Sequence, residues 1–169
     1  LIAAGLRAGG LRTFAKTTGT APRVIDAEGI DRIIHRLRRP SIGEQVRLLK
    51  YFSNEKPDVV VMECMAVQPQ YQWISEHQMV KSHIGVITNA RPDHLDEMGP
   101  TDVDVVKSLC NSIPIEGTVV TAEEKHKNIL KSVANDNQSD IIFSKEESIS
   151  DDELNKFNYI EHPQNIAIA

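Results

Sequence analysis

The sequence is short of cysteine, of long apolar runs and of excess positive charge, and each shortage excludes a class of protein. Its two cysteines, Cys64 and Cys110, form neither a disulfide framework nor a zinc motif, which is typical of reduced thiols in a cytosolic protein. No stretch approaches the roughly 20 apolar residues that span a bilayer. A net charge of −5 offers no basic footprint for nucleic acid. We therefore expect a cytoplasmic protein without a nucleic-acid partner.

The composition that remains is ordinary for a globular protein. Charged residues make up 25% and hydrophobic residues 40% of the chain, which is enough for one core. We expect a single domain over residues 1–169. Residues 1–6 and 165–169 are apolar segments typical of helices already under way, and neither has a cap or a polar tail. The domain is therefore expected to be truncated at both ends.

Short β-branched runs alternate with helical patterns along the chain. Runs this short, apolar on both faces, are typical of strands in a buried parallel sheet. Four clear runs and a weaker fifth are found at residues 59–62, 84–88, 118–121, 140–143 and 12–15.

Capping-box pairs, a hydroxyl residue followed three positions later by an acidic one, mark the starts of the intervening helices. The pairs are Ser41 and Glu44, Thr101 and Asp104, Thr121 and Glu124, and Ser150 and Glu153. Alternating strands and helices predict βαβ units. We therefore expect an α/β fold with three layers, α/β/α, around a mostly parallel sheet.

Chemically rich segments follow these strands, and ligands of such sheets bind outside the carboxyl ends of the strands. Residues 16–23, KTTGTAPR, surround Gly19 with three hydroxyls and two cations. Such a loop can present donors to a phosphate or a carboxylate, although turn chemistry alone also favours these residues. The basic cluster at residues 36–39 is either a solvated face or a surface for a polyanion.

Glu63 follows the apolar run 59–62, and a carboxylate there is costly unless it is paired or bound to a cation. An oxygen ligand of Mg²⁺ fits this position, and a helix cap or a partner of an arginine is the alternative. His94 follows another predicted strand, the run 84–88. Because parallel strands end at the same edge of a sheet, we expect the side chains of Glu63 and His94 to converge on one crevice.

Residues 88–100 are the most informative loop, since they combine amide, guanidinium, imidazole and carboxylate groups after a strand. His94 can ligate a metal as a neutral imidazole, and Asp93 or Asp96 can fix its tautomer. A solvated acidic loop is the alternative, but the density of chemistry at this location favours function.

Three strings in this order resemble a known family. They are residues 16–23 (KTTGTAPR), 62–67 (MECMAV) and 85–101 (GVITNARPDHLDEMGPT). The order of a Thr-Gly-Thr loop, Met-Glu and Thr-Asn-x-x-x-Asp-His-x-Asp is similar to the P-loop NTPase-like central ATPase domain of the Mur ligases and folylpolyglutamate synthetases. The strings look most like the ATPase subunit of poly-γ-glutamate synthetases, the ligases of capsule synthesis.

This resemblance implies an ATP-dependent amide ligase that polymerises glutamate through its γ-carboxyl group by way of an acyl phosphate. It implies ATP and Mg²⁺ as cofactors, and as partners glutamate, the polymer and the membrane subunits of a synthetase complex at the inner face of the membrane. Carried over, Glu63 and His94 are metal ligands, and His94 and Asp93 serve catalysis. Further residues bind the nucleotide (Asn89 and Arg91) or the substrate (Thr17, Thr18, Thr20 and Arg23).

One departure from the family is that its phosphate loop, G-x-x-G-K-[ST], does not occur in these residues. In the family that loop precedes a helix that residues 1–6 resemble. Another Mur-type ligase, such as a folylpolyglutamate synthetase, stays open as an alternative. So do a metal-dependent hydrolase using His94, Asp96 and Glu63, and a catalytically inactive scaffold domain.

We expect the 169-residue chain alone not to bind Mg·ATP with micromolar affinity. The phosphate loop supplies backbone N–H groups, a helix N-terminus and a lysine to the triphosphate. Each lost charge-assisted hydrogen bond costs about 1.5–3 kcal/mol, and about 1.4 kcal/mol is tenfold in affinity. Calorimetric titration is the measurement. Micromolar binding would show that other residues hold the phosphates.

Overall fold

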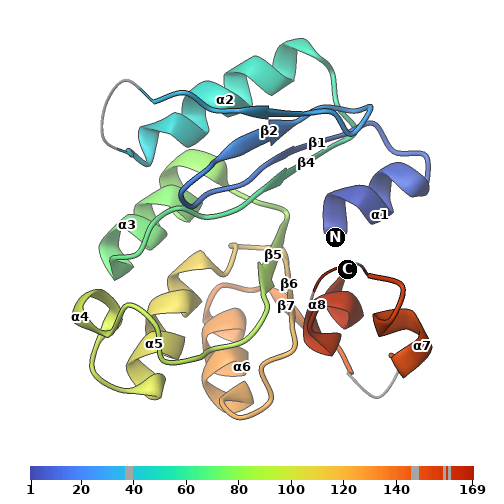
Figure 1. Ribbon diagram of the computed structural model, residues 1–169. Coiled ribbons are helices and arrows are strands. Elements are labelled where there is room, and N and C mark those ends of the chain that lie inside the picture. Colours follow the sequence, from blue (N-terminus) through green and yellow to red (C-terminus); the bar gives the residue numbers. More distant parts are fainter. Residues whose placement is uncertain (37–39, 146–148, 158, 160) are drawn as a thin grey trace. The chain divides into compact units, whose positions relative to one another are not determined.

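The computed structural model describes residues 1–36, 40–145, 149–157, 159 and 161–169 (Figure 1). The chain forms two compact units, Leu1–Ala66 and Val67–Ala169, and each has its own sheet. Helices alternate with parallel strand pairs, so the α/β class expected from the sequence is confirmed. The assignment of residues 1–169 to one truncated domain stays a prediction.

The first unit holds a four-stranded sheet in the order β3-β2-β1-β4. Its elements are α1 (Ile2–Ala8), β1 (Thr13–Lys16), β2 (Arg23–Ile25), β3 (Asp31–Ile33), α2 (Gly43–Asn54) and β4 (Val59–Met62). The pair β1–β4 is parallel, with Lys16 opposite Met62, whereas β2 and β3 are antiparallel additions. The run at 59–62 is confirmed as a strand, and the weaker run at 12–15 is a strand shifted by one residue.

Helix α2 lies against the sheet of the first unit (Figure 1), and aromatic packing holds it there. Phe14 of β1 and Phe52 of α2 are 3% and 0% exposed, with ring centroids 5.4 Å apart. Buried aromatic pairs at this spacing contribute packing energy beyond the area they remove from water. The carboxyl end of β1 is thereby held against α2.

The second unit holds a parallel three-stranded sheet in the order β5-β6-β7. Its first elements are α3 (Pro69–Ile74), the π-helical segment Ser75–Val80, β5 (Ile84–Ile87), α4 (Leu95–Met98), α5 (Asp102–Leu109) and the 3-10 turn Cys110–Ser112. Then follow β6 (Thr118–Thr121), α6 (Lys127–Asp136), β7 (Asp140–Phe143), α7 (Asp151–Leu154) and α8 (Pro163–Ile168). The predicted runs at 118–121 and 140–143 are confirmed, and β5 ends one residue before the predicted 88.

The core of this unit lies between one face of the sheet and the helices α5 and α6 (Figure 1). Ile87 and Val119 of the strands meet Val106 of α5 and Leu130 of α6, all at most 5% exposed. Burial of such side chains is worth about 1.5–3 kcal/mol each. This packing fixes the first turns of α5 and α6 beside the carboxyl ends of β5 and β6.

Two of the four predicted capping boxes form. Thr101 with Asp104 starts α5, and Ser150 with Glu153 starts α7. The pair Thr121 and Glu124 was wrong, because Thr121 is the last residue of β6 and α6 starts at Lys127.

The box at Ser41 was also wrong. The residue that precedes α2 is Ile42, and it makes no side-chain cap hydrogen bond. The carboxylate of Glu44 instead accepts two hydrogen bonds from Arg36, from Nε at 2.7 Å and from Nη2 at 2.8 Å. A charge-assisted bidentate pair is stronger than a bond to a neutral backbone N–H.

Within the described residues, every helix is too short or too polar to cross a membrane.

Candidate active site

The loop after β1 is closed by its own backbone. The N–H of Thr17 donates to the carbonyl of Arg23 at 2.9 Å, and the N–H of Arg23 donates back to Oγ1 of Thr17 at 3.0 Å. Gly19 at the tip has φ +84, in the left-handed region that glycine adopts without steric cost. Thr20 lies exposed beside it. The guanidinium of Arg23 pairs with Asp31 of β3.

Glu63 lies directly against this loop. Its N–H donates to the carbonyl of Lys16 at 3.0 Å, which continues the pairing of β1 and β4 by one residue. Its Oε2 accepts the N–H of Thr18 at 2.7 Å. The structure thus brings Glu63 together with the threonine loop, as expected for residues that follow two paired parallel strands.

A buried charged cluster behind this loop was missed by the sequence analysis. Lys16, the last residue of β1, is 1% exposed, and among the described residues its Nζ has no hydrogen-bond partner. Oε1 of Glu44 lies 3.9 Å from Nζ of Lys16, and Arg36 holds the same carboxylate. Arg36 therefore belongs to an ion pair rather than to an open basic face. The other residues of the basic cluster, 37–39, lie outside the described residues.

Burial and charge oppose each other in this cluster. Desolvation lowers the pKa of Lys16, and the nearby Glu44 only partly offsets it. The hydrogen bonds from Arg36 lower the pKa of Glu44. The carboxylate is therefore ionised and well satisfied, whereas the ammonium is costly to keep charged.

The loop after β5 carries the second group of predicted residues. Asn89 is half-buried, while Arg91, Asp93 and His94 are exposed. Oδ1 of Asp93 accepts the backbone N–H of His94 at 2.9 Å. Oδ2 of Asp93 lies 3.8 Å from Nε2 of His94, beyond hydrogen-bonding distance.

His94 also has an unusual backbone, with φ 48 and ψ 42, immediately before α4. Few residues other than glycine adopt this left-handed conformation, although histidine is among those enriched in it. Such conformations gather at functional sites, where the surrounding structure holds them.

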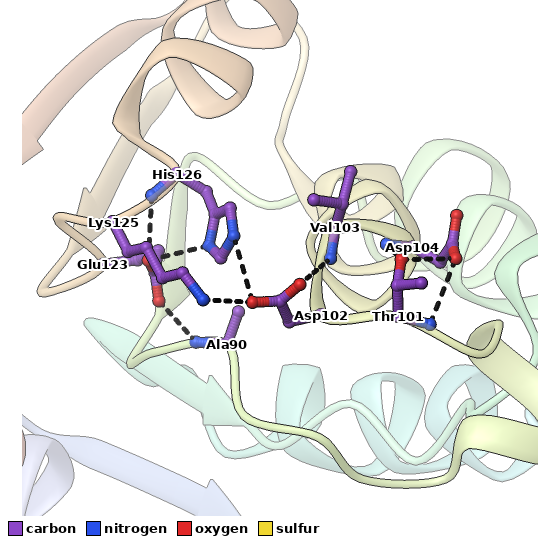
Figure 2. Close-up of polar contacts among 8 residues, drawn as sticks. All are labelled: Ala90, Thr101, Asp102, Val103, Asp104, Glu123, Lys125 and His126. Carbon is purple, nitrogen blue, oxygen red and sulfur yellow. Dashed lines mark hydrogen bonds and ion pairs between the residues drawn. The ribbon is translucent and has the colours of Figure 1, made fainter.

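A second buried polar cluster was also missed by the sequence analysis, and it contacts the same loop (Figure 2). Glu123 and His126 are 6% and 8% exposed. Oε2 of Glu123 accepts the N–H of Ala90 at 2.8 Å. Its Oε1 accepts the N–H of His126 at 3.0 Å and lies 3.1 Å from Nδ1 of that ring. Because a carboxylate only accepts, Nδ1 carries the proton.

Asp102 continues this set on the other side of the imidazole. Its Oδ2 lies 3.6 Å from Nε2 of His126 and pairs with Lys125, and its Oδ1 accepts the N–H of Val103 at 2.9 Å. The hydrogen bond from Lys125 lowers the pKa of Asp102. Figure 2 shows the chain of contacts running from Ala90 through Glu123 and His126 to the start of α5.

The predicted residues thus fall in two groups. Glu63, Thr17, Thr18, Thr20 and Arg23 belong to the first unit, and Asn89, Arg91, Asp93 and His94 belong to the second. Within each group the residues lie on one loop or on paired loops. In the part of the chain that the structure describes, no three His, Cys, Asp or Glu side chains cluster around a metal position. The metal site shared by Glu63 and His94 stays a prediction.

In each unit a pair of parallel strands ends in polar loops, which is the arrangement of an α/β protein that binds its ligands at the carboxyl ends of its strands. The sequence matches the family described as "Mur ligase middle domain" over residues 6–169. The chain therefore belongs to this family, and the resemblance drawn from the three strings is confirmed.

Two curated relatives are similar over nearly the whole chain. "Capsule biosynthesis protein CapB" of Bacillus anthracis is 38% identical over 162 residues, which are 94% of this chain and 34% of that protein. "PGA synthase CapB" of Bacillus subtilis (strain 168) is 33% identical over 162 residues, 95% of this chain and 41% of that protein. The chain spans between a third and about two fifths of the length of these relatives.

Solved structures share the fold at low sequence identity. The apo form of L. casei FPGS is 16% identical, with a TM-score of 0.58 over 84% of this chain and 40% of that one. A bifunctional folylpolyglutamate synthase/dihydrofolate synthase from Yersinia pestis, complexed with AMPPNP and Mn ion, is 18% identical, with a TM-score of 0.55 over 82% of this chain and 37% of that one.

The buried ammonium gives a test of the first unit. Because the pKa of Lys16 in the folded chain lies below its ordinary 10.5, the unfolded chain holds this proton to higher pH. The Lys16 contribution to stability therefore rises with pH in the alkaline range below 10.5 and is unfavourable at neutral pH. We expect Lys16→Met to raise the free energy of unfolding at pH 7 and to flatten the alkaline rise.

Urea unfolding at several pH values measures both effects. Lys50→Met, at an exposed position of α2, is the matched control and should leave the alkaline rise unchanged. Lower stability of Lys16→Met at pH 7 would mean that the attraction of Glu44 outweighs the desolvation of Lys16.

Proposed function

We propose that the protein containing this chain is an ATP-dependent amide ligase that joins glutamates through their γ-carboxyl groups in capsule synthesis. The observation that carries the proposal is the identity of 38% and 33%, over nearly the whole chain, to proteins named for capsule biosynthesis and PGA synthesis. Membership of the Mur ligase middle domain family supports the same reaction class.

The proposed reaction has two steps: the γ-phosphoryl group of ATP is transferred to glutamate in the first and released as phosphate in the second. The γ-carboxylate of glutamate attacks the γ-phosphorus of ATP, and ADP leaves, giving an acyl phosphate. The amine of a second glutamate then attacks the acyl carbon, loses a proton and expels phosphate, which carries away one oxygen of the original carboxylate. Both reactants are anionic, so the barrier depends on screening of negative charge.

The residues on the two loops fit a Mg²⁺ ion with few protein ligands. Mg²⁺ uses one or two protein side chains together with phosphates and water. We assign Glu63 and His94 as these ligands. Bound Mg²⁺ would neutralise charge on the phosphoryl oxygens. The N–H of Thr18, at 2.7 Å from Glu63, leaves the other carboxylate oxygen for the ion.

The residues of the loop after β5 are assigned to the nucleotide and to catalysis. We assign Asn89 and Arg91 to the nucleotide, because an amide and an exposed guanidinium can hold phosphate and sugar groups. Asp93 serves catalysis with His94 by holding its backbone N–H at 2.9 Å.

The threonine loop is assigned to the carboxylates of the substrate. Thr17, Thr18 and Thr20 offer hydroxyl donors there, with Arg23 as the cation. The partners are glutamate, the growing polymer and membrane subunits of a synthetase complex. The resemblance to capsule synthetases supports a further proposal, a cytoplasmic enzyme held at the inner face of the membrane through its partners.

The alternatives have weaker support. The folylpolyglutamate synthases are at most 18% identical in the two comparisons described above, and such a likeness concerns the fold. A metal-dependent hydrolase needs a water-activating ion with several protein ligands. The similarity to proteins named for capsule biosynthesis and PGA synthesis favours a ligase instead.

Isotope transfer in the full-length protein tests the reaction. With glutamate labelled with ¹⁸O in its carboxylates, the acyl-phosphate route moves one labelled oxygen into inorganic phosphate for each amide bond formed. We expect label in phosphate and ADP as the nucleotide product, measured by mass spectrometry. Label in AMP would indicate adenylation and overturn the assignment.

Substitution of Glu63 tests the metal. In the full-length protein, Glu63→Gln should raise the Mg²⁺ concentration needed for half-maximal ATP cleavage at least about tenfold, since even residues outside the ligand shell change metal affinity by about 10–100-fold. Glu28→Gln, an exposed position in the same unit, is the control. An unchanged Mg²⁺ dependence with unchanged melting temperature would remove Glu63 from the metal site.

A further inference from the structure

We propose that Glu123 is a positioning residue that holds the backbone of the Asn89–Arg91 segment in its working shape, with His126 holding Glu123 in turn. This inference deepens the proposed function, because it rests on the assignment of Asn89 and Arg91 to the nucleotide. It is carried by contacts in the second unit alone.

The first step is the grip of Glu123 on two backbone N–H groups. One oxygen accepts from Ala90 at 2.8 Å and the other from His126 at 3.0 Å. The carboxylate is 6% exposed. A buried carboxylate is stable only when donors satisfy it, and bonds to an ionised acceptor are stronger than neutral ones. The peptide of Ala90 is therefore held firmly from one side.

The second step is that the chain after β6 contacts the loop after β5 twice. The N–H of Ala122 donates to the carbonyl of Thr88 at 3.2 Å, one residue before the Glu123 contact. The N–H of Glu123 itself donates to Oγ1 of Thr121 at 3.0 Å. Because β5 and β6 are parallel neighbours, both loops leave the sheet at the same edge. Glu123 is thus fixed by its own strand before it reaches Ala90.

The third step is the support behind Glu123. His126 presents Nδ1 to Glu123 at 3.1 Å, while its Nε2 lies 3.6 Å from Oδ2 of Asp102, beyond hydrogen-bonding distance. Asp102 is anchored to the first turn of α5 through the N–H of Val103, and His126 is the residue that precedes α6. The residue that precedes α6 therefore supports the Glu123 carboxylate through both its backbone N–H and its ring, and Asp102 of α5 lies near the other side of the ring (Figure 2).

The consequence concerns the two side chains that flank Ala90. Rotation of the Ala90 peptide would change the directions of Asn89 and Arg91 together. Displacement of a positioned group by about 1 Å can cost about a hundredfold in rate. A purely structural role for Glu123 would instead lower stability without a selective effect on nucleotide use.

The experiment compares Glu123→Gln with Glu124→Gln in the full-length protein. The glutamine amide must face a backbone N–H with its own donor, so one of the two bonds is lost. Glu124 is the neighbouring exposed carboxylate, paired only with Lys127 at 3.6 Å among the contacts of the described residues. Amide hydrogen exchange of a peptide spanning residues 88–94 should become at least about tenfold faster in Glu123→Gln alone.

Kinetics give the functional readout. In Glu123→Gln the KM for ATP should rise at least about tenfold while the KM for glutamate stays within about twofold, and Glu124→Gln should match the unmodified protein. If Glu123→Gln does not fold, Glu123→Asp replaces it, because the shorter side chain keeps the charge and moves the carboxylate away from the N–H of Ala90. The same effects, smaller in size, are expected there.

The outcomes separate the two proposals. Unchanged exchange over residues 88–94 in Glu123→Gln would overturn the positioning role, as would an equal rise in the KM for ATP and the KM for glutamate. Faster exchange over residues 88–94 supports the positioning role even if the unmodified protein shows no glutamate-dependent ATP cleavage. In that case the proposed function alone is overturned.

Discussion

Parallel pairing of neighbouring strands is the constraint on which both groups of site residues depend. It makes the chain leave two strands at the same edge of a sheet, so the loops that follow must share space. In each unit the two neighbouring loops are joined by the same kind of hydrogen bond. A glutamate after one strand accepts a backbone N–H from the loop after its neighbour. Glu63 holds Thr18 at 2.7 Å, and Glu123 holds Ala90 at 2.8 Å.

The two glutamates differ in burial, and this difference separates their chemistry. Glu63 is exposed, so its carboxylate can take a further ligand from solution. Glu123 is 6% exposed, and both of its oxygens already accept hydrogen bonds. The same residue type at equivalent points of two parallel pairs therefore suits a cation in one unit and an internal support in the other.

Sequence patterns predicted the strands well but did not predict the contacts between charged side chains. The predicted runs at 59–62, 118–121 and 140–143 have the same first and last residues as the strands in the structure. A short buried strand consists of consecutive apolar residues, so the sequence shows its bounds directly. The hairpin β2–β3 was missed, since its strands have three residues each and carry arginine and aspartate. Glu123 and His126 were missed because residues 122–126 look like a solvated helix start. The contact of Glu123 with Ala90 joins residues 33 positions apart, and no local sequence pattern indicates such a contact.

The backbone of His94 has a consequence for how this position can change during evolution. A residue there must satisfy the metal chemistry proposed for it and also accept a left-handed conformation with φ 48. Asparagine and aspartate share that tolerance and also offer metal-binding oxygens, whereas β-branched residues would be outliers there. The fold therefore narrows the accessible substitutions at this position to a few polar types before any selection on activity acts.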